Sequence, residues 1–387
     1  MIIQSLLDND LYKFTMMQAF HHHFPEAQSK HKFILRSKGV DLVPYKKQIE
    51  EEIEHMCSLN FKPEELDYLS SLGFMKPDYI DFLEDIRLKT RGMCIKEENG
   101  QLVLNYEGSL VQKILFEVPI MAIISEVYLK NLTKYAEAHR VGYEKIKLKI
   151  EKLEDAGIPI KFADFGTRRR FSREWHDIVV SLLKNLAPDF FIGTSNVLLA
   201  MKHKVKPIGT MAHEWIQAGQ ALDKVQLKNS QKFMFEIWVK EYRGDLGILL
   251  TDTIGMKPFL KDFDKYFAKL YDGCRHDSGD PIKWGRNLIN HYDKLGIDPK
   301  TKTAVFSDGL NFDKIISLAK EFRHEIQTSF GIGTNLTNDV GVKPLSMVIK
   351  LVELNGNPVA KISDEPEKAI CPDPEFLNYL KKVYKVD

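Results

Sequence analysis

Several features that would place a protein in a special class are scarce or absent in this chain of 387 residues. Its four cysteines form no CxxC pair and no cysteine–histidine spacing suited to a metal, so we expect a reduced, intracellular protein without structural zinc. The net charge of +1 provides no field that would attract nucleic acid or a membrane surface. No uninterrupted apolar run reaches the about 20 residues that a membrane span needs. The first residues carry acids where a signal peptide is basic and then apolar, and we therefore expect a cytoplasmic protein.

Common nucleotide and hydrolase motifs are also missing. The chain has no GxxxxGKS/T phosphate loop, no GxSxG nucleophile elbow and no HExxH zinc helix. Hydrophobic residues make up 44% and charged residues 28%, which is typical of a globular protein, and the length suggests two or three domains.

The first 125 residues predict an α+β layer. Helical spacing covers residues 11–20 and 48–57, and two short strands at 92–96 and 101–106 are joined across Asn99-Gly100, a typical hairpin turn. From residue 123 to 156 the apolar spacing is helical until Gly157 ends it. We expect one long helix here, acting as the hinge between two domains.

After Gly157 a short apolar run, a polar or glycine-rich tip and a helical pattern recur. Alternating strands and helices predict a parallel sheet, and so many tips rich in ligand-type residues favour a barrel, in which all strand ends meet at one mouth. The tail predicts another hairpin and a last helix that pack on the N-terminal layer. We therefore expect residues 126–341 to form an irregular parallel α/β barrel and residues 1–125 plus 342–387 to form a discontinuous α+β sandwich domain. The seven runs are residues 160–166, 190–195, 205–213, 247–253, 268–280, 303–309 and 326–334.

Three of these tips predict chemistry from their residues alone. Gly331 and Gly333 let backbone N–H groups approach a phosphate. Asp277 and Asp280 flank Ser-Gly and suit ribose hydroxyls or Mg²⁺, although an Asp-Gly turn followed by a helix-capping aspartate explains the same pattern. Three consecutive arginines after residue 167 suit a polyphosphate, with one or two of them facing it.

Further motifs occur along almost the whole chain, and the set is LLDNDLYK (6–13), MMQA (16–19), DFGTRRRFS (164–172), FIGTSNVLLA (191–200), GTMAHEW (209–215), LTDT (250–253), RHDSGDP (275–281), SDGLN (307–311) and FGIGTNLTND (330–339). Taken together, these motifs resemble nicotinate phosphoribosyltransferase, a type II phosphoribosyltransferase family of NAD salvage. The resemblance implies that nicotinate and 5-phosphoribosyl 1-pyrophosphate give nicotinate mononucleotide and pyrophosphate, with ATP hydrolysed alongside and Mg²⁺ required. Members are monomers or dimers, so a homodimer is among the expected partners.

The resemblance also implies roles for single residues. His213 corresponds to the histidine that ATP phosphorylates, and Asp252 to the acid that orients it. Ser195 would select nicotinate, because the related amide-using enzyme has an aspartate there, and Tyr12 would reach in from a neighbouring subunit in dimeric relatives. The expected substrate-binding residues are Tyr12, Phe165, Arg168, Ser195, Thr210, Arg275, Asp277, Gly309, Gly331, Gly333 and Thr334, and the expected Mg²⁺ ligands are Asp277 and Asp280.

Two other functions compete with this one. A barrel phospho-sugar lyase or decarboxylase would share the phosphate loop but needs a Schiff-base lysine, and no lysine stands at the very tip of the seven runs. A non-catalytic phosphohistidine carrier would use His213 but would not need the arginine and aspartate tips.

Overall fold

The structure is a computed structural model that describes residues 1–365, 369 and 371–386 and divides into two compact units. Unit 1 comprises residues 1–155, 162–209 and 332–350, and unit 2 comprises residues 156–161, 210–331 and 351–387. The units group the chain differently from the predicted domains, since the tail from residue 351 belongs to unit 2. The boundaries at residues 125 and 342 therefore stay predictions.

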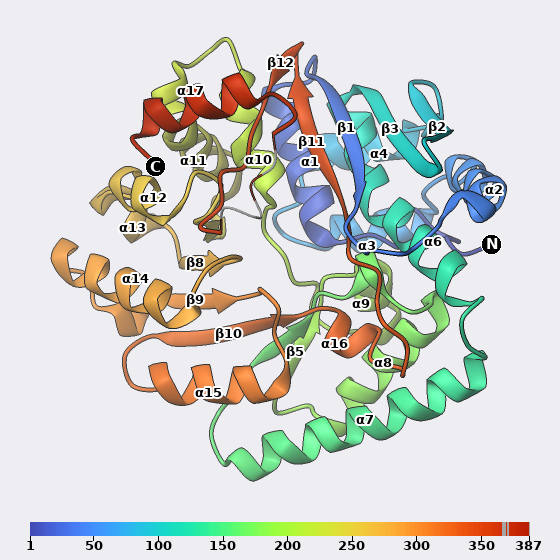
Figure 1. The fold of residues 1–387 in the computed structure, drawn as a ribbon. Coiled ribbons are helices and arrows are strands. Elements are labelled where there is room, and N and C mark those ends of the chain that lie inside the picture. The colour runs from blue at the N-terminus through green and yellow to red at the C-terminus, as the bar shows by residue number, and fades with distance from the viewer. Residues whose placement is uncertain (366–368, 370, 387) are drawn as a thin grey trace. The chain divides into compact units, whose positions relative to one another are not determined.

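Unit 1 contains a mostly antiparallel layer that fits the predicted α+β layer (Figure 1). Strand β3 pairs with β2 on one side and with β1 on the other, and the chain at Ser346, just before β11, accepts backbone hydrogen bonds from Arg36 and Ser37. The elements of this part are α1 (Leu11–His23), β1 (Gln28–Leu35), α2 (Lys46–Cys57), α3 (Pro63–Ser70), α4 (Pro77–Asp85), β2 (Met93–Glu98), β3 (Gln101–Ser109), α5 (Leu110–Lys113), α6 (Glu117–Leu129) and β11 (Met347–Leu354).

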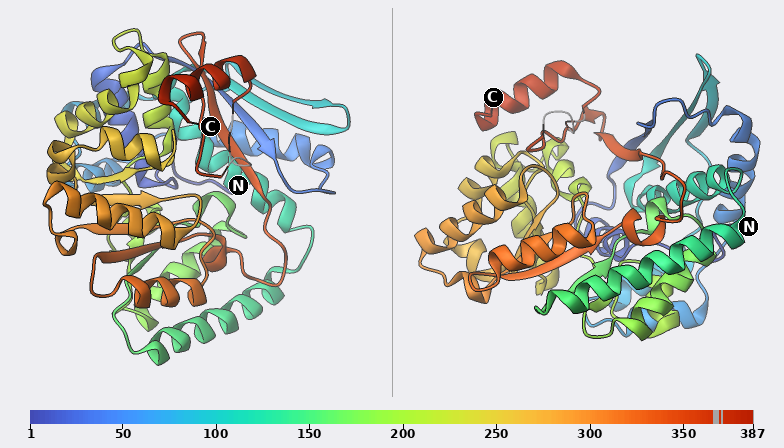
Figure 2. Two further views of the ribbon diagram at one scale, coloured as in Figure 1. Left: turned by 60° about the vertical axis from the view of Figure 1, so that its left-hand side comes forward. Right: turned by 60° about the horizontal axis from the view of Figure 1, so that its bottom comes forward.

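The predicted long helix over residues 123–156 is wrong, because two helices occupy the region. α6 ends at Leu129, and α7 (Tyr135–Ala156) is a separate helix, as both views in Figure 2 also show. At the break the side-chain amide of Asn131 donates to the Val127 carbonyl over 2.7 Å, a local hydrogen bond that competes with continuation of the helix.

The second part of unit 1 holds the parallel pair β4 (Phe162–Asp164) and β5 (Phe191–Thr194), with α8 (Arg173–Leu186), α9 (Val197–His203) and α16 (Thr334–Thr337). Gly193 in β5 has a φ of 144°, and a Cβ there would lie 2.0 Å from the Lys206 carbonyl oxygen. Only glycine fits this position. The close approach fixes the backbone that presents Thr194 and Ser195.

Unit 2 contains four parallel strands in the order β10-β9-β8-β7. Each of these strands is short and buried on at least one side, as expected for strands covered by helices. The elements are α10 (His213–Ala218), α11 (Ser230–Tyr242), β6 (Arg243–Leu246), β7 (Ile248–Leu250), α12 (Met256–Asp262), α13 (Lys265–Leu270), β8 (Gly273–His276), α14 (Pro281–Leu295), β9 (Thr303–Phe306), α15 (Phe312–Phe322), β10 (Gln327–Ile332), β12 (Asn357–Pro358) and α17 (Pro374–Tyr384).

Six of the seven predicted runs contain a strand, and the run over residues 205–213 does not. Its only ladder contact among the described residues is an isolated parallel bridge between Thr194 and Pro207. Proline has no N–H to donate, and Gly209 with a φ of 154° bends the chain two residues later. His213 is therefore reached through an extended loop rather than a strand.

The C-terminal segment completes unit 2. β12 pairs with the end of β11, so the predicted hairpin is present, with its second strand beginning at Asn357 inside the segment expected to be the turn. In Figure 2 helix α17, in red, lies beside the chain around the start of α11, where the Tyr384 hydroxyl is 2.9 Å from Ser230 Oγ. Leu380 of this helix packs with Ile254, Ala360 and Ile362 in a buried cluster, which fixes the segment that follows β12.

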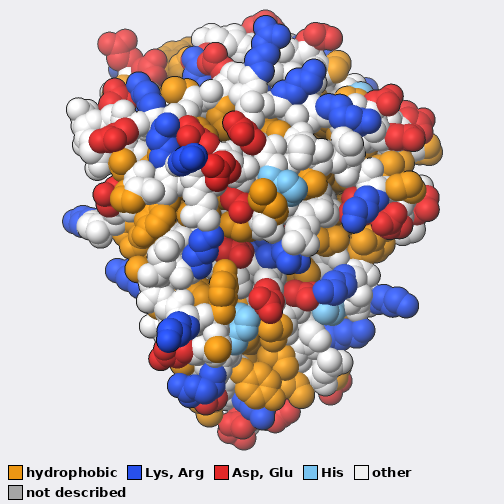
Figure 3. All heavy atoms as spheres, turned by 90° about the vertical axis from the view of Figure 1, so that its right-hand side faces the viewer, with side chains coloured by type: hydrophobic (Ala, Val, Ile, Leu, Met, Phe, Trp, Pro, Cys, Tyr) orange, Lys and Arg blue, Asp and Glu red, His pale blue; other side chains and the backbone are white. Residues whose placement is uncertain are grey.

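Acidic and basic side chains are interspersed over the face in Figure 3, in keeping with the net charge of +1. Over the described part of the chain, none of the helices combines the length and apolar character of a membrane span.

Candidate active site

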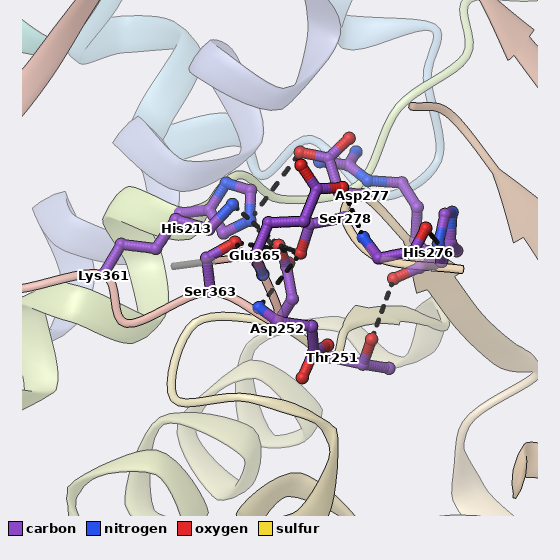
Figure 4. A network of polar contacts seen from close by, with 12 residues as sticks. His213, Thr251, Asp252, His276, Asp277, Ser278, Lys361, Ser363 and Glu365 are labelled. Carbon is purple, nitrogen blue, oxygen red and sulfur yellow. Dashed lines mark hydrogen bonds and ion pairs between the residues drawn. The ribbon is translucent and has the colours of Figure 1, made fainter. Parts of the chain in front are cut away.

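The first candidate site lies in unit 2, around the imidazole of His213 (Figure 4). His213 is the first residue of α10, and Asp252 lies in the loop after β7. His213 Nε2 is 2.7 Å from Asp252 Oδ1 and 3.7 Å from Asp277 Oδ2. Both His213 and Asp252 are buried. The imidazole is therefore held on one edge, at Nε2, by two acids from two different strand ends.

Asp252 is the centre of this cluster. Its Oδ2 lies 2.7 Å from Lys361 Nζ and accepts a hydrogen bond from Ser278 Oγ at 2.6 Å. Burial opposes ionisation of this carboxyl, but His213 and Lys361 outweigh burial and hold the pKa of Asp252 well below its usual range. Asp252 is therefore an anion with every oxygen engaged.

The same surroundings keep His213 neutral. Burial, and to a smaller extent the charge of Lys361, lower the pKa of His213 to about 4, although Asp252 and Asp277 act in the opposite direction. A neutral imidazole carries one N–H, and Nε2 must carry it to donate to the anionic Asp252. The lone pair is then on Nδ1. An imidazole in this state is a nucleophile.

Asp277 and Arg275 come from the end of β8 and the loop after it. Asp277 Oδ1 accepts a hydrogen bond from Ser307 Oγ at 2.7 Å. Burial raises the pKa of Asp277, but Arg275 and His213 more than offset burial and hold it below the usual value. The Nε of Arg275 is buried and has no hydrogen-bond partner among the described residues. These two side chains thus keep donor and acceptor capacity for a ligand.

The two predicted magnesium ligands lie in different settings. Asp280 is exposed and caps α14, accepting a hydrogen bond from the Lys283 backbone N–H at 2.8 Å. Asp277 instead belongs to a group with His213 and Asp252 in which the potential ligand atoms lie within 4.8 Å of one another. The capping function that the sequence left open for Asp280 is thus present, and Asp277 is the better placed of the two for a cation.

The second candidate site lies in unit 1, around Ser195. Ser195 Oγ donates to Asp10 Oδ1 over 2.7 Å, and the Ser195 carbonyl accepts a hydrogen bond from the Leu11 N–H. Tyr12 and Lys13 follow on α1, with Lys13 Nζ 5.7 Å from the Tyr12 ring centroid. The expected substrate-selecting serine and the expected stacking tyrosine are thus neighbours within one chain.

A buried ion pair supports this site from behind. Arg170 binds both oxygens of Asp8 at 2.7 Å, and Asn196 Nδ2 donates to the same carboxylate. Burial raises the pKa of Asp8, but Arg170 outweighs burial and lowers the value overall. The pair joins the segment before α1 to the segments that carry Arg168 and Ser195.

The remaining predicted ligand residues are distributed over both units. Gly333 precedes the four-residue helix α16, and a Cβ on it would lie 3.4 Å from the Phe165 carbonyl oxygen, so this backbone passes close to Phe165 in unit 1. Arg168 forms an ion pair with Glu117 at 3.3 Å. Thr334 is the first residue of α16 in unit 1. In unit 2, Gly331 lies in β10, and Gly309 has a φ of 54°. Also in unit 2, Thr210 Oγ1 donates a hydrogen bond to the Ile248 carbonyl.

Sequence reasoning missed several members of both sites. Lys361 was missed because the tail was expected to pack on the N-terminal layer, and nothing in the sequence indicates its ion pair with Asp252. Asp8 and Asp10 lie in the motif LLDNDLYK, but nothing in their spacing indicates that they contact residues 162 and 185 positions later. A buried charge next to a predicted site residue becomes visible only once the fold is known.

Comparison with known proteins gives a consistent result. Residues 160–387 match the nicotinate phosphoribosyltransferase (NAPRTase) family, and residues 7–125 match the NAPRTase N-terminal domain. The nicotinate phosphoribosyltransferase of Bordetella petrii is 50% identical over 390 residues, covering 100% of this chain and 99% of the relative. A crystal structure of the Vibrio cholerae nicotinate phosphoribosyltransferase superimposes with a TM-score of 0.95 at 39% sequence identity, covering 100% of this chain and 94% of the other. A crystal structure of the Porphyromonas gingivalis nicotinate phosphoribosyltransferase superimposes with a TM-score of 0.93 at 35% sequence identity, covering 100% of both chains. The chain therefore belongs to the nicotinate phosphoribosyltransferase family.

Proposed function

We propose that this enzyme joins nicotinate to 5-phosphoribosyl 1-pyrophosphate, giving nicotinate mononucleotide and pyrophosphate, and that it hydrolyses ATP through a phosphohistidine at His213. The observation that carries the proposal is the neutral, buried imidazole held at Nε2 by Asp252. Family membership supports the phosphoribosyl transfer and ATP as co-substrate.

The phosphorylation step follows from the hydrogen bonding of His213. With the proton on Nε2, the Nδ1 lone pair attacks the γ-phosphorus of ATP, the bond from that phosphorus to the bridging oxygen breaks, and ADP leaves. Positive charge that develops on the ring is stabilised by Asp252 at 2.7 Å. Water later attacks the phosphorus, and phosphate and free histidine are regenerated.

The transfer step needs alignment and charge stabilisation more than covalent help from the protein. As pyrophosphate leaves, C1 of the ribose develops cationic character and the pyridine nitrogen attacks it. In unit 1, Tyr12 and Phe165 would stack on the pyridine ring, Arg168 would bind phosphate, and Gly333 and Thr334 would hold the 5′-phosphate. In unit 2, Arg275, Asp277, Thr210, Gly309 and Gly331 would contact the ribose and phosphates.

A magnesium ion would stabilise the leaving pyrophosphate and the phosphates of ATP when bound. Magnesium prefers oxygen ligands, and Asp277 offers them with Oδ2 not engaged in a short hydrogen bond among the described residues. Asp252 already has Lys361, Ser278 and His213 on its oxygens. We therefore favour Asp277 over Asp280 and Asp252 as the protein ligand.

Product formation with and without ATP, using nicotinate and then nicotinamide, tests the proposal. His213→Ala should abolish labelling by γ-labelled ATP and lose the stimulation by ATP, while slow ATP-independent transfer persists. Full stimulation by ATP in this variant would contradict the phosphohistidine. A carrier would be labelled without turnover, and a lyase would show neither.

The competing functions are not favoured. Lys361, the lysine in the His213 cluster, forms an ion pair with Asp252 at 2.7 Å and is not a free amine for a Schiff base. The irregular barrel, the sandwich, the homodimer and the cytoplasmic location remain predictions of the sequence, and the parallel pairing of β4 with β5 and of β7 to β10 supports the first of them.

A further inference from the structure

Asp10 places a second carboxyl group beside the residue expected to select nicotinate. Its side chain is buried, with 2% of the residue exposed, and Ser195 is 3% exposed. Ser195 Oγ donates to Asp10 Oδ1 over 2.7 Å. The N-terminal position of Asp10 on α1 does not explain the carboxyl group, because it makes no side-chain capping hydrogen bond to the helix.

The hydrogen bond conflicts with simple recognition of nicotinate by Ser195. A serine hydroxyl has one proton to donate. If Asp10 is ionised, that proton is committed to Asp10, and a nicotinate carboxylate next to Ser195 would meet an oxygen lone pair and a second buried anion. Two carboxylates in one buried site are not both ionised without a large energetic cost.

A proton on Asp10 removes the conflict. The protonated carboxyl donates to Ser195 Oγ, and the serine hydroxyl then turns to donate to the carboxylate of nicotinate. We propose that Asp10 is a specificity-determining residue that takes up one proton from solvent when nicotinate binds and thereby sets the direction of the Ser195 hydroxyl. This inference rests on the proposed function, because it assumes that nicotinate binds beside Ser195. No covalent bond of the substrate changes in the step.

The charged surroundings of Asp10 are mixed. Arg168 and Arg170 face it as cations, and Asp164 faces it as an anion. Burial is the largest influence and raises the pKa of Asp10 above its usual value, although Arg168 and hydrogen bonds from Ser195 and Thr167 act against it. An approaching nicotinate carboxylate adds a further anion and moves the pKa in the same, upward direction.

The same pair has the opposite preference for the amide. When Asp10 is ionised, Ser195 donates to it and presents a lone pair, which accepts a hydrogen bond from the amide nitrogen of nicotinamide. Selectivity for nicotinate over nicotinamide should therefore fall as the pH rises, by up to about tenfold per pH unit for a single linked proton.

Calorimetric titration of the full-length protein with nicotinate in two buffers of different ionisation enthalpy measures the proton directly. At pH 8 the wild type should take up close to one proton per nicotinate and none per nicotinamide. Asp10→Asn should bind nicotinate without proton uptake, since its amide N–H donates to Ser195 permanently, and its selectivity should no longer depend on pH. Glu126→Gln is the matched control, because Glu126 is another carboxyl in unit 1 whose pKa burial raises, but it contacts Tyr135 and the Arg173 backbone.

Each result supports or overturns the proposed proton uptake by Asp10. Uptake of a proton in the wild type and in Glu126→Gln, but not in Asp10→Asn, supports the inference. Binding without proton uptake in the wild type overturns it, as does undiminished uptake in Asp10→Asn, and the wild-type measurement stands even if a variant does not fold. A wild type that neither binds nor converts nicotinate would overturn the proposed function itself, and the absence of any binding heat distinguishes that case.

Discussion

Replacing Lys361 by methionine tests the charge balance around the proposed phosphohistidine. Lys361 and Asp252 form an ion pair of 2.7 Å whose side chains are only 6% and 1% exposed. Removing one partner of a buried pair leaves an uncompensated charge, which costs about 3–5 kcal/mol of stability. Lys361→Met and Asp252→Asn should therefore each destabilise unit 2 by that amount.

The double variant separates this explanation from a simple loss of packing. The double variant lacks both charges, so neither replacement leaves its partner's charge buried and unpaired. The loss of stability should therefore be smaller than the sum of the two single losses by about 2–3 kcal/mol. Urea unfolding followed by tryptophan fluorescence is suitable, because Trp215, Trp238 and Trp284 of the four tryptophans lie in unit 2. Additive losses, within about 0.5 kcal/mol, would refute the reasoning.

A second measurement on the same variant concerns His213. Lys361 is a cation that lowers the pKa of His213, so Lys361→Met should raise that pKa above the value of about 4. The acid limb of phosphohistidine formation should then move to higher pH. Lys361→Arg keeps the charge and is the control, and an acid limb that does not move in Lys361→Met would contradict the assigned role of Lys361.

Three further predictions follow from the two sites. The folded-state pKa of His213 is about 4, below the ordinary value near 6.5, so the imidazole stays neutral from pH 8 down to about pH 5. Labelling of the protein by ATP should therefore not change with pH over this range. A decline in labelling with a midpoint near pH 6.5 would contradict this prediction. Ser195→Asp places a second carboxylate beside Asp10, which now accepts a hydrogen bond from Ser195, and should lower kcat/KM for nicotinate. An unchanged value would count against selection by Ser195. Arg170→Met leaves Asp8 buried without its partner and should cost about 3–5 kcal/mol in chemical denaturation, whereas a loss below about 1 kcal/mol would show that the pair is not needed.

The sequence predicts the local elements well where a short-range pattern determines them. The hairpin across Asn99-Gly100 is present as β2 and β3, because a turn with positive φ at both positions is encoded by those two residues. Six of the seven apolar runs contain strands for a similar reason. The failures at residues 130–134 and 205–209 occur where single side chains, Asn131 and Pro207, interrupt a pattern that is otherwise regular.

The candidate sites could be predicted only in part. Motifs indicated His213, Asp252 and Ser195, since each lies at a polar tip after an apolar run. Their partners Lys361 and Asp10 come from distant segments, and a lysine or aspartate has no sequence signature that distinguishes a buried ion pair from a solvated surface charge. Yet Lys361 adds to the effect of burial in keeping His213 neutral, and Asp10 accepts the hydrogen bond of the Ser195 hydroxyl, so the chemistry depends on contacts that local patterns do not encode.

The charges near His213 suggest how the proposed phosphorylation of His213 would be coupled to substrate binding. Before phosphorylation the anions Asp252 and Asp277 are balanced by the cations Lys361 and Arg275, and the imidazole is neutral. A phosphoryl group on Nδ1 adds roughly two negative charges to this balanced cluster. The phosphorylated state should therefore bind a divalent cation more tightly than the free state, and by reciprocity a bound cation stabilises the phosphohistidine to the same extent. Hydrolysis of the proposed phosphohistidine would remove this excess charge, and a cation held by Asp277 would then be bound less tightly.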